Sequence, residues 1–413
     1  YEESVTVGKS LTLRGEGETT IIDGGWAEDV VEVTASYVTV SGLTIVGGIR
    51  GVYVAGTESV PVYVFTLSDS MIAYNAQFGV FLEYSIGGFI SGNKVSDNGD
   101  RGIYLRSSQM IVVDGNTVSG HSEYGVLVLW SNRCNVTNNR VSENRQGTPP
   151  APIDIGICVS ECRGSITVSG NTVSNNTGNG IYVLYSSGTV LSGNTASKNG
   201  GMGIHLRYSP SVLRNNSMAG NGYNLEVEGS EPPDFIHDVD ATNTVDGRPV
   251  CYWVNQHNRR VPEDAGYVAA VNSTGISVEG LNLAGNGQGV LFVHTSNSTI
   301  VDVNTSHNRI GISLLNSGNN KVHRNTVADN GRGIKLVGDP FASEKRYGNI
   351  LTGNTLRNNS FGVEFGWPCS GNAIFHNNFI DNQRQVNDLS GLSYTNTWDD
   401  GFPLGRNYWS DYK

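Results

Sequence analysis

Short hydrophobic stretches recur along this chain at a nearly constant interval. Each begins with a glycine, followed by an apolar, a variable and an apolar position. The stretches read GVYV at 51, GVFL at 79, GIYL at 102, GVLV at 125, GICV at 156, GIYV at 180, GIHL at 203, GVLF at 289, GISL at 311, GIKL at 333 and GVEF at 362. Such alternation predicts short β-strands with one buried face, and its recurrence predicts a repeat protein.

A polar phrase keeps the same interval. It holds a small residue, an asparagine and, five positions later, a second asparagine, as in SGNKVSDN at 91–98. The first asparagines of these phrases are Asn93, Asn116, Asn139, Asn171, Asn194, Asn216, Asn325, Asn354 and Asn377. Amides that lie above one another in stacked parallel strands hydrogen-bond along the stack. We therefore expect an asparagine ladder.

These two phrases predict the fold. An interval of about 22 to 24 residues that contains several short strands is typical of one coil of a solenoid. We predict an all-β chain that forms a single-stranded right-handed parallel β-helix, with an asparagine ladder. Neighbouring coils bury their alternate side chains against each other, for example Ile103 and Leu105 over Val126 and Val128.

The interval also predicts how the chain is divided. We expect a run of β-helix coils over 1–229, irregular coils with a protruding loop over 230–275, and a second run of coils with a closing motif over 276–413. Two longer gaps within the runs predict loops at 147–154 and 338–347.

Composition limits the partners. The net charge is −11 and no basic cluster interrupts it, so we expect no nucleic-acid partner. No run of 18 apolar residues occurs, so we expect no membrane span in this chain.

The five cysteines are Cys134, Cys158, Cys162, Cys251 and Cys369. Buried thiols are favoured for them, and a disulfide between Cys134 and Cys162 is left open because the two fall in neighbouring coils.

Outward positions of the coils supply the candidate contact residues. Two places after each glycine the column reads Tyr53, Phe81, Tyr104, Leu127, Cys158, Tyr182 and His205, and four places after it reads Ala55, Glu83, Arg106, Leu129, Ser160, Leu184 and Arg207. Exposed rings beside Glu and Arg are typical of a sugar-binding groove. The residues expected to contact a glycan or a partner protein are Tyr53, Phe81, Tyr104, Tyr182, His205 and Arg207. The alternative is that rings simply favour strands and pack under a loop or a neighbouring molecule.

Candidates for chemistry are sparse. Paired carboxylates on adjacent coils, which glycoside hydrolysis uses, are not found, and no catalytic residue is assigned. An enzyme would have to use Glu83, Tyr104 and Arg106. No metal site is assigned either, and His237, Asp238 and Asp240 form the best local cluster. The four methionines form no tract, so the sequence gives little support to a copper site with soft ligands.

Seven Asn-x-Ser/Thr sequences would be glycan acceptors in an exported protein. They begin at Asn135, Asn175, Asn215, Asn272, Asn297, Asn304 and Asn358.

Three longer motifs carry a family resemblance. They are the start, YEESVTVGKSLTLRGEGETTIIDGG, the middle, HDVDATNTVDGRPVCYWVNQ with VPEDAGYVAAVNSTGISVEGLNL, and the end, NTWDDGFPLGRNYWSDY. With these motifs the whole chain resembles the NosD-type parallel β-helix proteins, also called the carbohydrate-binding and sugar hydrolase repeat family. It resembles their archaeal cell-surface branch most closely, although Arg406 stands where the family usually has glycine.

The resemblance implies a cell-surface or periplasmic location but no single activity. Members include maturation factors for a copper enzyme, surface proteins thought to bind sugars, and enzymes. Members usually have about 30 residues before the first motif and an acidic, calcium-like loop after the last one. We therefore expect this chain to be part of a longer exported protein. No cofactor is expected, and calcium is left open.

Together these observations favour a non-catalytic extracellular cell-surface protein with a structural, adhesive or glycan-contacting role, such as a subunit of a surface layer or filament. Its expected partners are copies of itself, other cell-surface proteins and glycans, since β-helix ends expose open strand edges. Two alternatives stay open. One is a polysaccharide-active enzyme (lyase, epimerase or hydrolase), and the other is a NosD-like periplasmic maturation factor for a copper enzyme.

Overall fold

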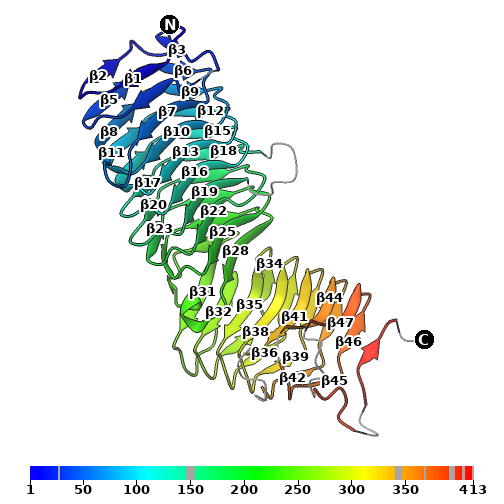
Figure 1. Ribbon diagram of the computed structural model, residues 1–413. Helices are drawn as coiled ribbons and strands as arrows, with labels where there is room; N and C mark the ends of the chain where they lie inside the picture. The colour runs from blue at the N-terminus through cyan, green and yellow to red at the C-terminus, as the bar shows by residue number, and fades with distance from the viewer. Residues whose placement is uncertain are drawn as a thin grey trace. The chain divides into compact units, whose positions relative to one another are not determined.

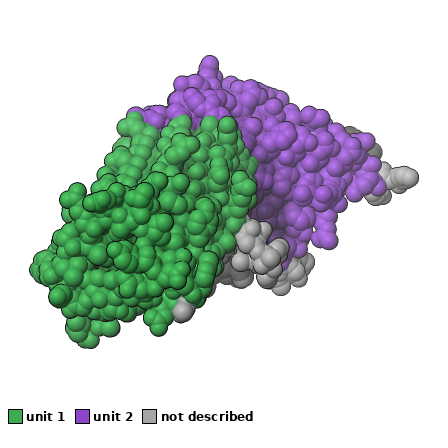
Figure 2. All heavy atoms as spheres, turned by 90° about the horizontal axis from the view of Figure 1, so that it is seen from above, with its two compact units in different colours: residues 1–222 green, residues 223–413 purple. Residues whose placement is uncertain are grey.

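The chain forms two compact units, residues 1–222 and 223–413 (Figure 2). The computed structural model describes residues 1–26, 28–145, 154–339, 347–366, 369–389, 396–401 and 405–411. Within each unit, short parallel strands from successive coils stack into long sheets (Figure 1). The predicted parallel β-helix is therefore confirmed.

The first unit has three sheets, and every coil gives one strand to each. The first sheet contains β1 (Val5–Val7), β4 (Val31–Val33), β7 (Arg50–Ala55), β10 (Phe78–Glu83), β13 (Arg101–Arg106), β16 (Tyr124–Leu129), β19 (Ile155–Ser160), β22 (Ile181–Leu184) and β25 (Met202–Arg207). The second contains β2 (Thr12–Arg14), β5 (Val38–Ser41), β8 (Val62–Ser68), β11 (Ser85–Ser91), β14 (Gln109–Asp114), β17 (Asn135–Thr137), β20 (Thr167–Ser169), β23 (Thr189–Ser192) and β26 (Ser211–Arg214). The third contains β3 (Ile21–Asp23), β6 (Thr44–Val46), β9 (Met71–Ala73), β12 (Lys94–Ser96), β15 (Thr117–Ser119), β18 (Arg140–Ser142), β21 (Thr172–Ser174), β24 (Thr195–Ser197) and β27 (Ser217–Ala219).

The second unit repeats this plan. It begins with β28 (Tyr223–Glu228), and one sheet then contains β31 (Arg248–Val254), β32 (Tyr267–Val271), β35 (Gln288–Val293), β38 (Ile310–Leu315), β41 (Arg332–Val337), β44 (Phe361–Gly366) and β47 (Arg384–Asp388). Another contains β33 (Ser277–Glu279), β36 (Thr299–Val301), β39 (Lys321–His323), β42 (Ile350–Thr352) and β45 (Ala373–Phe375). The last contains β34 (Asn282–Ala284), β37 (Asn304–Ser306), β40 (Thr326–Ala328), β43 (Thr355–Arg357), β46 (Asn378–Ile380) and β48 (Tyr408–Trp409).

The stretch 230–275 belongs to the second unit. It holds the short 3-10 helix η1 (Pro232–Phe235), then β29 (Asp238–Val239) and β30 (Thr244–Val245). Strand β30 pairs antiparallel with β31, unlike the parallel strand pairs within the sheets described above. Strands β31 and β32 then start the first sheet of this unit. In the part of the chain that the structure describes, no helix has the length and apolar character needed to cross a membrane.

The asparagine ladder forms as predicted. The side-chain nitrogen of Asn116 donates to Asn139 Oδ1 at 3.0 Å, and its backbone nitrogen donates to the same oxygen at 2.9 Å. Asn139 makes the same two bonds to Asn171. That second step spans the loop predicted at 147–154, which lies almost wholly outside the described residues, as does most of the loop at 338–347. The insertions therefore leave the coil register unchanged.

The glycine phrase and the asparagine phrase pack against each other in the structure. A Cβ atom added at Gly125 would lie 2.8 Å from the side-chain nitrogen of Asn144, the second asparagine of its phrase, and 2.7 Å from the oxygen of Gly156. Only glycine fits there, because real Cβ atoms need more space. Inside the coils, Ile103 pairs with Val126 and Leu105 with Val128, as predicted, and all four are fully buried.

Candidate functional site

The outward column of the first sheet is in register. Phe81 pairs with Tyr53 in one neighbouring strand and with Tyr104 in the other. The ring centroids are 5.2 Å apart for Tyr53 and Phe81, and 4.7 Å apart for Phe81 and Tyr104. Further along, the Tyr182 and His205 rings are 4.8 Å apart. The sequence therefore placed these side chains in the correct column.

The expectation that this column is exposed is wrong for several of its rings. Phe81 is 5% exposed and Tyr104 is 6% exposed, and His205 is also buried. Phe78, one column away, packs its ring edge-on against both Phe81 and Tyr104, and the Arg101 guanidinium lies 5.0 Å from the Phe78 ring centroid. These rings bury one another, so they form an external hydrophobic cluster and not an open stripe.

Of the candidate catalytic residues, Glu83 and Arg106 meet as an ion pair at 3.2 Å. Glu83 also accepts a hydrogen bond from the Tyr53 hydroxyl at 3.0 Å. Burial raises the pKa of Tyr104, and burial together with the Glu83 hydrogen bond raises the pKa of Tyr53. A tyrosine base needs an accessible phenolate, which these environments oppose. The geometry therefore gives a polar network in which Glu83 and Arg106 neutralise each other's charge.

A row of side chains that sequence reasoning missed lies directly after the strands of the first sheet. Three of its six members are exposed and three are half-buried. We call it the turn column. Its members in successive coils are Tyr84, Ser107, Trp130, Glu161, Tyr185 and Tyr208. Each has a positive φ between 44° and 51°. Trp130 is 48% exposed and Tyr185 is 56% exposed, and Tyr185 stacks on Tyr208 with ring centroids 4.9 Å apart.

Part of the turn column lines a surface groove of about 680 Å³, which we call the turn groove. Its lining residues are Trp130, Ser131, Asn132, Glu161, Arg163 and Tyr185. The indole nitrogen of Trp130 donates to Glu161 Oε2 at 3.0 Å, which fixes the ring. This volume lies within the usual range for a small-ligand site, about 300–1,000 Å³.

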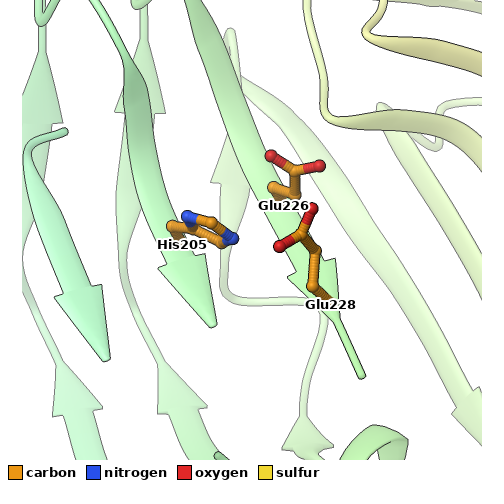
Figure 3. Close-up of side chains that lie close together, drawn as sticks. All are labelled: His205, Glu226 and Glu228. Carbon is orange, nitrogen blue, oxygen red and sulfur yellow. The ribbon is translucent and has the colours of Figure 1, made fainter. Parts of the chain in front are cut away.

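Buried ionic contacts on the second unit were also missed. Glu226 and Glu228 project from the same face of β28 (Figure 3). The Arg309 guanidinium binds both, through Nε at 2.8 Å to Glu226 and through Nη2 to Glu228. Figure 3 also labels His205, but that residue belongs to the first unit, and Arg309 already supplies the cation that these carboxylates require. We infer no metal site there.

A second ionic contact lies further along the same unit. Glu364 is 1% exposed and accepts from Arg332 Nε at 2.7 Å, while Asn387 donates to its other oxygen at 3.2 Å. Lys335 lies 3.7 Å from the same carboxylate, and burial lowers the pKa of this lysine. The charged side chains satisfy one another, as buried ions must.

The metal candidates His237, Asp238 and Asp240 do not bring their ligand atoms together within the described residues. His237 is buried with its ring 5.5 Å from that of Tyr252, and burial lowers its pKa to about 3. Asp240 caps a local turn by accepting bonds from Thr242 and Asn243. Asp238 is exposed.

All five cysteines are free and buried, so the disulfide considered between Cys134 and Cys162 is not present. A row of serines forms another ladder, in which the backbone nitrogen of Ser85 donates to Ser108 Oγ and that of Ser108 to Ser131 Oγ. Cys162 takes the place of a serine in this row, and its backbone nitrogen donates to Ser186 Oγ at 2.9 Å. Cys134 lies in a different column and donates to the Asn132 oxygen. Burial raises the pKa of Cys134, Cys162 and Cys369 to about 11, which disfavours the thiolate.

The predicted glycan acceptors lie on the surface. Six of the seven asparagines are exposed, and Asn135, within β17, is half-buried. Accessibility therefore allows modification at each exposed site, and glycosylation stays a prediction.

The fold is a β-solenoid with a groove on its surface, and family comparisons agree on the fold. The family described as "Periplasmic copper-binding protein (NosD)" matches residues 152–237 and 239–413, and "Right handed beta helix region" matches residues 29–188. Since the first match covers well over half of the chain, the protein belongs to the NosD family. The second match supports the predicted right-handedness. No curated protein matches the chain.

Several solved structures resemble the chain at low identity. A complex of XylC with xylose is 13% identical over 48% of this chain and 38% of that chain, with a TM-score of 0.37. Tailspike protein 2 of Escherichia coli O157:H7 bacteriophage CAB120 is 12% identical over 61% and 44%, with a TM-score of 0.42. The mannuronan C-5 epimerase AlgE4 A-module of Azotobacter vinelandii is 17% identical over 88% and 91%, with a TM-score of 0.33. The chain thus spans less than half the length of the first two.

The copper named in the family description does not fit the residues present. Copper sites with soft ligands use thiolate, thioether and imidazole groups close together. The methionines lie on four different strands, β9, β14, β25 and β27. Among the described residues, no group combines cysteine with histidine at ligand distances. We derive no chemistry from copper.

Proposed function

We propose that this protein is an exported, non-catalytic β-helix protein that binds polysaccharide in the turn groove. The observation that carries the proposal is the pair of exposed rings, Trp130 and Tyr185, which line one groove two coils apart. Coil stacking at about 4.8 Å separates them by roughly 10 Å along the axis. Aromatic faces at such positions stack on pyranose rings, while polar lining groups bind hydroxyls.

The family supports the proposed location. Its description names a periplasmic protein, and the sequence resemblance adds cell-surface members. We place this protein outside the cytoplasm, at the cell surface or in the periplasm. Contacts with copies of itself or with other surface proteins are part of the proposal. Native material isolated as an ordered array would support such contacts, and a free monomer would count against them.

Truncation of the two rings tests the groove. Trp130→Ala and Tyr185→Ala should each weaken binding to an immobilised polysaccharide by about tenfold, because central aromatic residues dominate binding energy. Tyr74→Ala is the matched control, since Tyr74 is also 56% exposed and also has a positive φ, but lies after β9 in the third sheet. If Trp130→Ala and Tyr185→Ala bind the polysaccharide as tightly as Tyr74→Ala does, the groove is not the binding site.

The rival enzyme function is tested separately. The Glu83–Arg106 ion pair and the buried Tyr104 argue against acid–base chemistry on this face. Incubation of the whole protein with a panel of uronic-acid polymers should give no unsaturated product. Reproducible turnover would replace our proposal with a polysaccharide lyase.

The copper-maturation rival predicts bound metal. We expect protein purified without chelator to lack stoichiometric copper, and copper at one equivalent would favour that rival.

A further inference from the structure

We propose that the polysaccharide bound in the turn groove is anionic, with carboxylate or sulfate groups spaced about two coils apart. This inference rests on the proposed function and names the ligand class. The groove and its margins carry arginines although the whole chain has a net charge of −11. Arginine forms two parallel hydrogen bonds with carboxylate or sulfate oxygens, so it is the side chain best suited to such groups.

Cations and exposed rings alternate from coil to coil. Arg106 ends β13, and its guanidinium lies 5.4 Å from the Trp130 ring centroid in the next coil. Arg163 follows β19 one coil further and lines the groove. Tyr185 comes in the coil after that, and then Arg207 at the end of β25, 5.3 Å from the Tyr208 ring centroid.

Arg106, Arg163 and Arg207 lie in alternate coils, which strand spacing separates by roughly 10 Å along the coil axis. The Trp130 coil also carries the exposed Arg133. The exposed rings Trp130 and Tyr185 lie in the coils between them. A linear polymer lying along the coil axis would meet a cation, then a ring, then a cation. This order suits a chain in which every second sugar carries a negative charge.

Two acidic side chains lie in this region. Glu83 forms an ion pair with Arg106, so Arg106 is already neutralised within the protein. Glu161 accepts the Trp130 indole hydrogen. Arg163 is exposed, and among the described residues no ion pair or hydrogen bond of its side chain is present. Arg163 is therefore the side chain best placed to bind an external anion.

The test uses the full chain and four probes: hyaluronan, which carries one carboxylate per disaccharide, its carboxyl-reduced derivative, chondroitin sulfate and neutral dextran. We expect hyaluronan to bind at least about tenfold more tightly than its reduced derivative, because a hydrogen bond to a charged group is worth about that factor. Arg163→Gln should remove this difference and leave binding of the reduced polymer unchanged. Arg140→Gln, an exposed arginine on β18 of the third sheet, should change neither.

The outcomes separate the two claims. Equal affinity for hyaluronan and its reduced form, with Trp130→Ala still weakening both, would overturn the anionic ligand and leave the proposed function standing. If the unmodified protein binds none of the probes, both the anionic ligand and the proposed function are overturned. Chondroitin sulfate carries both a carboxylate and a sulfate per disaccharide. If the anionic ligand is correct, its affinity relative to hyaluronan shows whether an added sulfate strengthens binding.

Discussion

Asn354→Ala should lower the free energy of unfolding by roughly 3–5 kcal/mol. Asn354 is fully buried, and its amide nitrogen donates to Asn377 Oδ1 at 2.9 Å and to the Val322 oxygen at 2.8 Å. Its own oxygen accepts from both the backbone and side-chain nitrogens of Asn325. Alanine would remove all four bonds. Asn325 Nδ2 would keep the Ile300 oxygen and Asn377 Oδ1 would keep the backbone nitrogen of residue 354. The Asn325 backbone nitrogen and the Val322 oxygen would each lose this partner, at a cost of about 1–3 kcal/mol per buried group.

Denaturant unfolding followed by circular dichroism measures this loss. Asn282→Ala is the matched control, since Asn282 lies on β34 of the same unit and is exposed. We expect the control to change stability by about 0.5 kcal/mol or less. A similar small change for Asn354→Ala would show that the ladder contributes little to stability.

The fold was predictable because residues that contact each other in the structure recur along the sequence at one shared interval. The glycine of one phrase and the second asparagine of the other touch in the structure, as Gly125 and Asn144 do. Their shared interval therefore encodes a spatial contact. The second unit has a further ladder, Asn320 to Asn349 to Asn372, that the sequence analysis did not extract. Its residues stand outside the two phrases on which the interval was counted.

The exposure of the site was harder to predict than its register. Sequence spacing placed Phe81 correctly above Tyr53, but burial of Phe81 depends on Phe78, which belongs to a neighbouring column. The turn column was missed because it mixes rings with Ser107 and Glu161 and so shows no uniform repeat. A signal was present, since Tyr84, Trp130, Tyr185 and Tyr208 all directly follow a strand of the first sheet. The Glu364–Arg332 contact joins strands separated by an insertion, so the interval did not reveal it.

His121→Asn should make the stability of the protein less sensitive to acid. His121 stands where the other phrases have their second asparagine, in a second ladder that runs from Asn98 through His121 to Asn144. Asn98 donates its backbone hydrogen to His121 Nδ1 at 3.2 Å, the Val95 oxygen lies 3.2 Å from Nε2, and the His121 backbone nitrogen donates to Asn144 Oδ1. This arrangement needs the neutral ring with its proton on Nε2. Burial lowers the pKa of His121 to about 4 from an ordinary value of 6.5.

The sign of the effect follows from proton binding. Between pH 6.5 and pH 4 the unfolded chain protonates this histidine and the folded chain does not, so stability falls as the pH falls through that window. The shift corresponds to about 3 kcal/mol, since one pKa unit is worth about 1.4 kcal/mol. Asparagine keeps a ladder amide and cannot be protonated, so the variant should lose less stability between these pH values by about that amount.

Denaturant unfolding at a series of pH values from 7 to 4 tests this expectation. His237, whose pKa burial also lowers, to about 3, supplies a similar acid sensitivity that the variant retains. His257→Asn changes an exposed histidine and should leave the pH profile unaltered. Parallel profiles for His121→Asn and the unmodified protein would mean that His121 is protonated in the folded state. The ladder would then have to accommodate a charged ring, contrary to the hydrogen bonds described above.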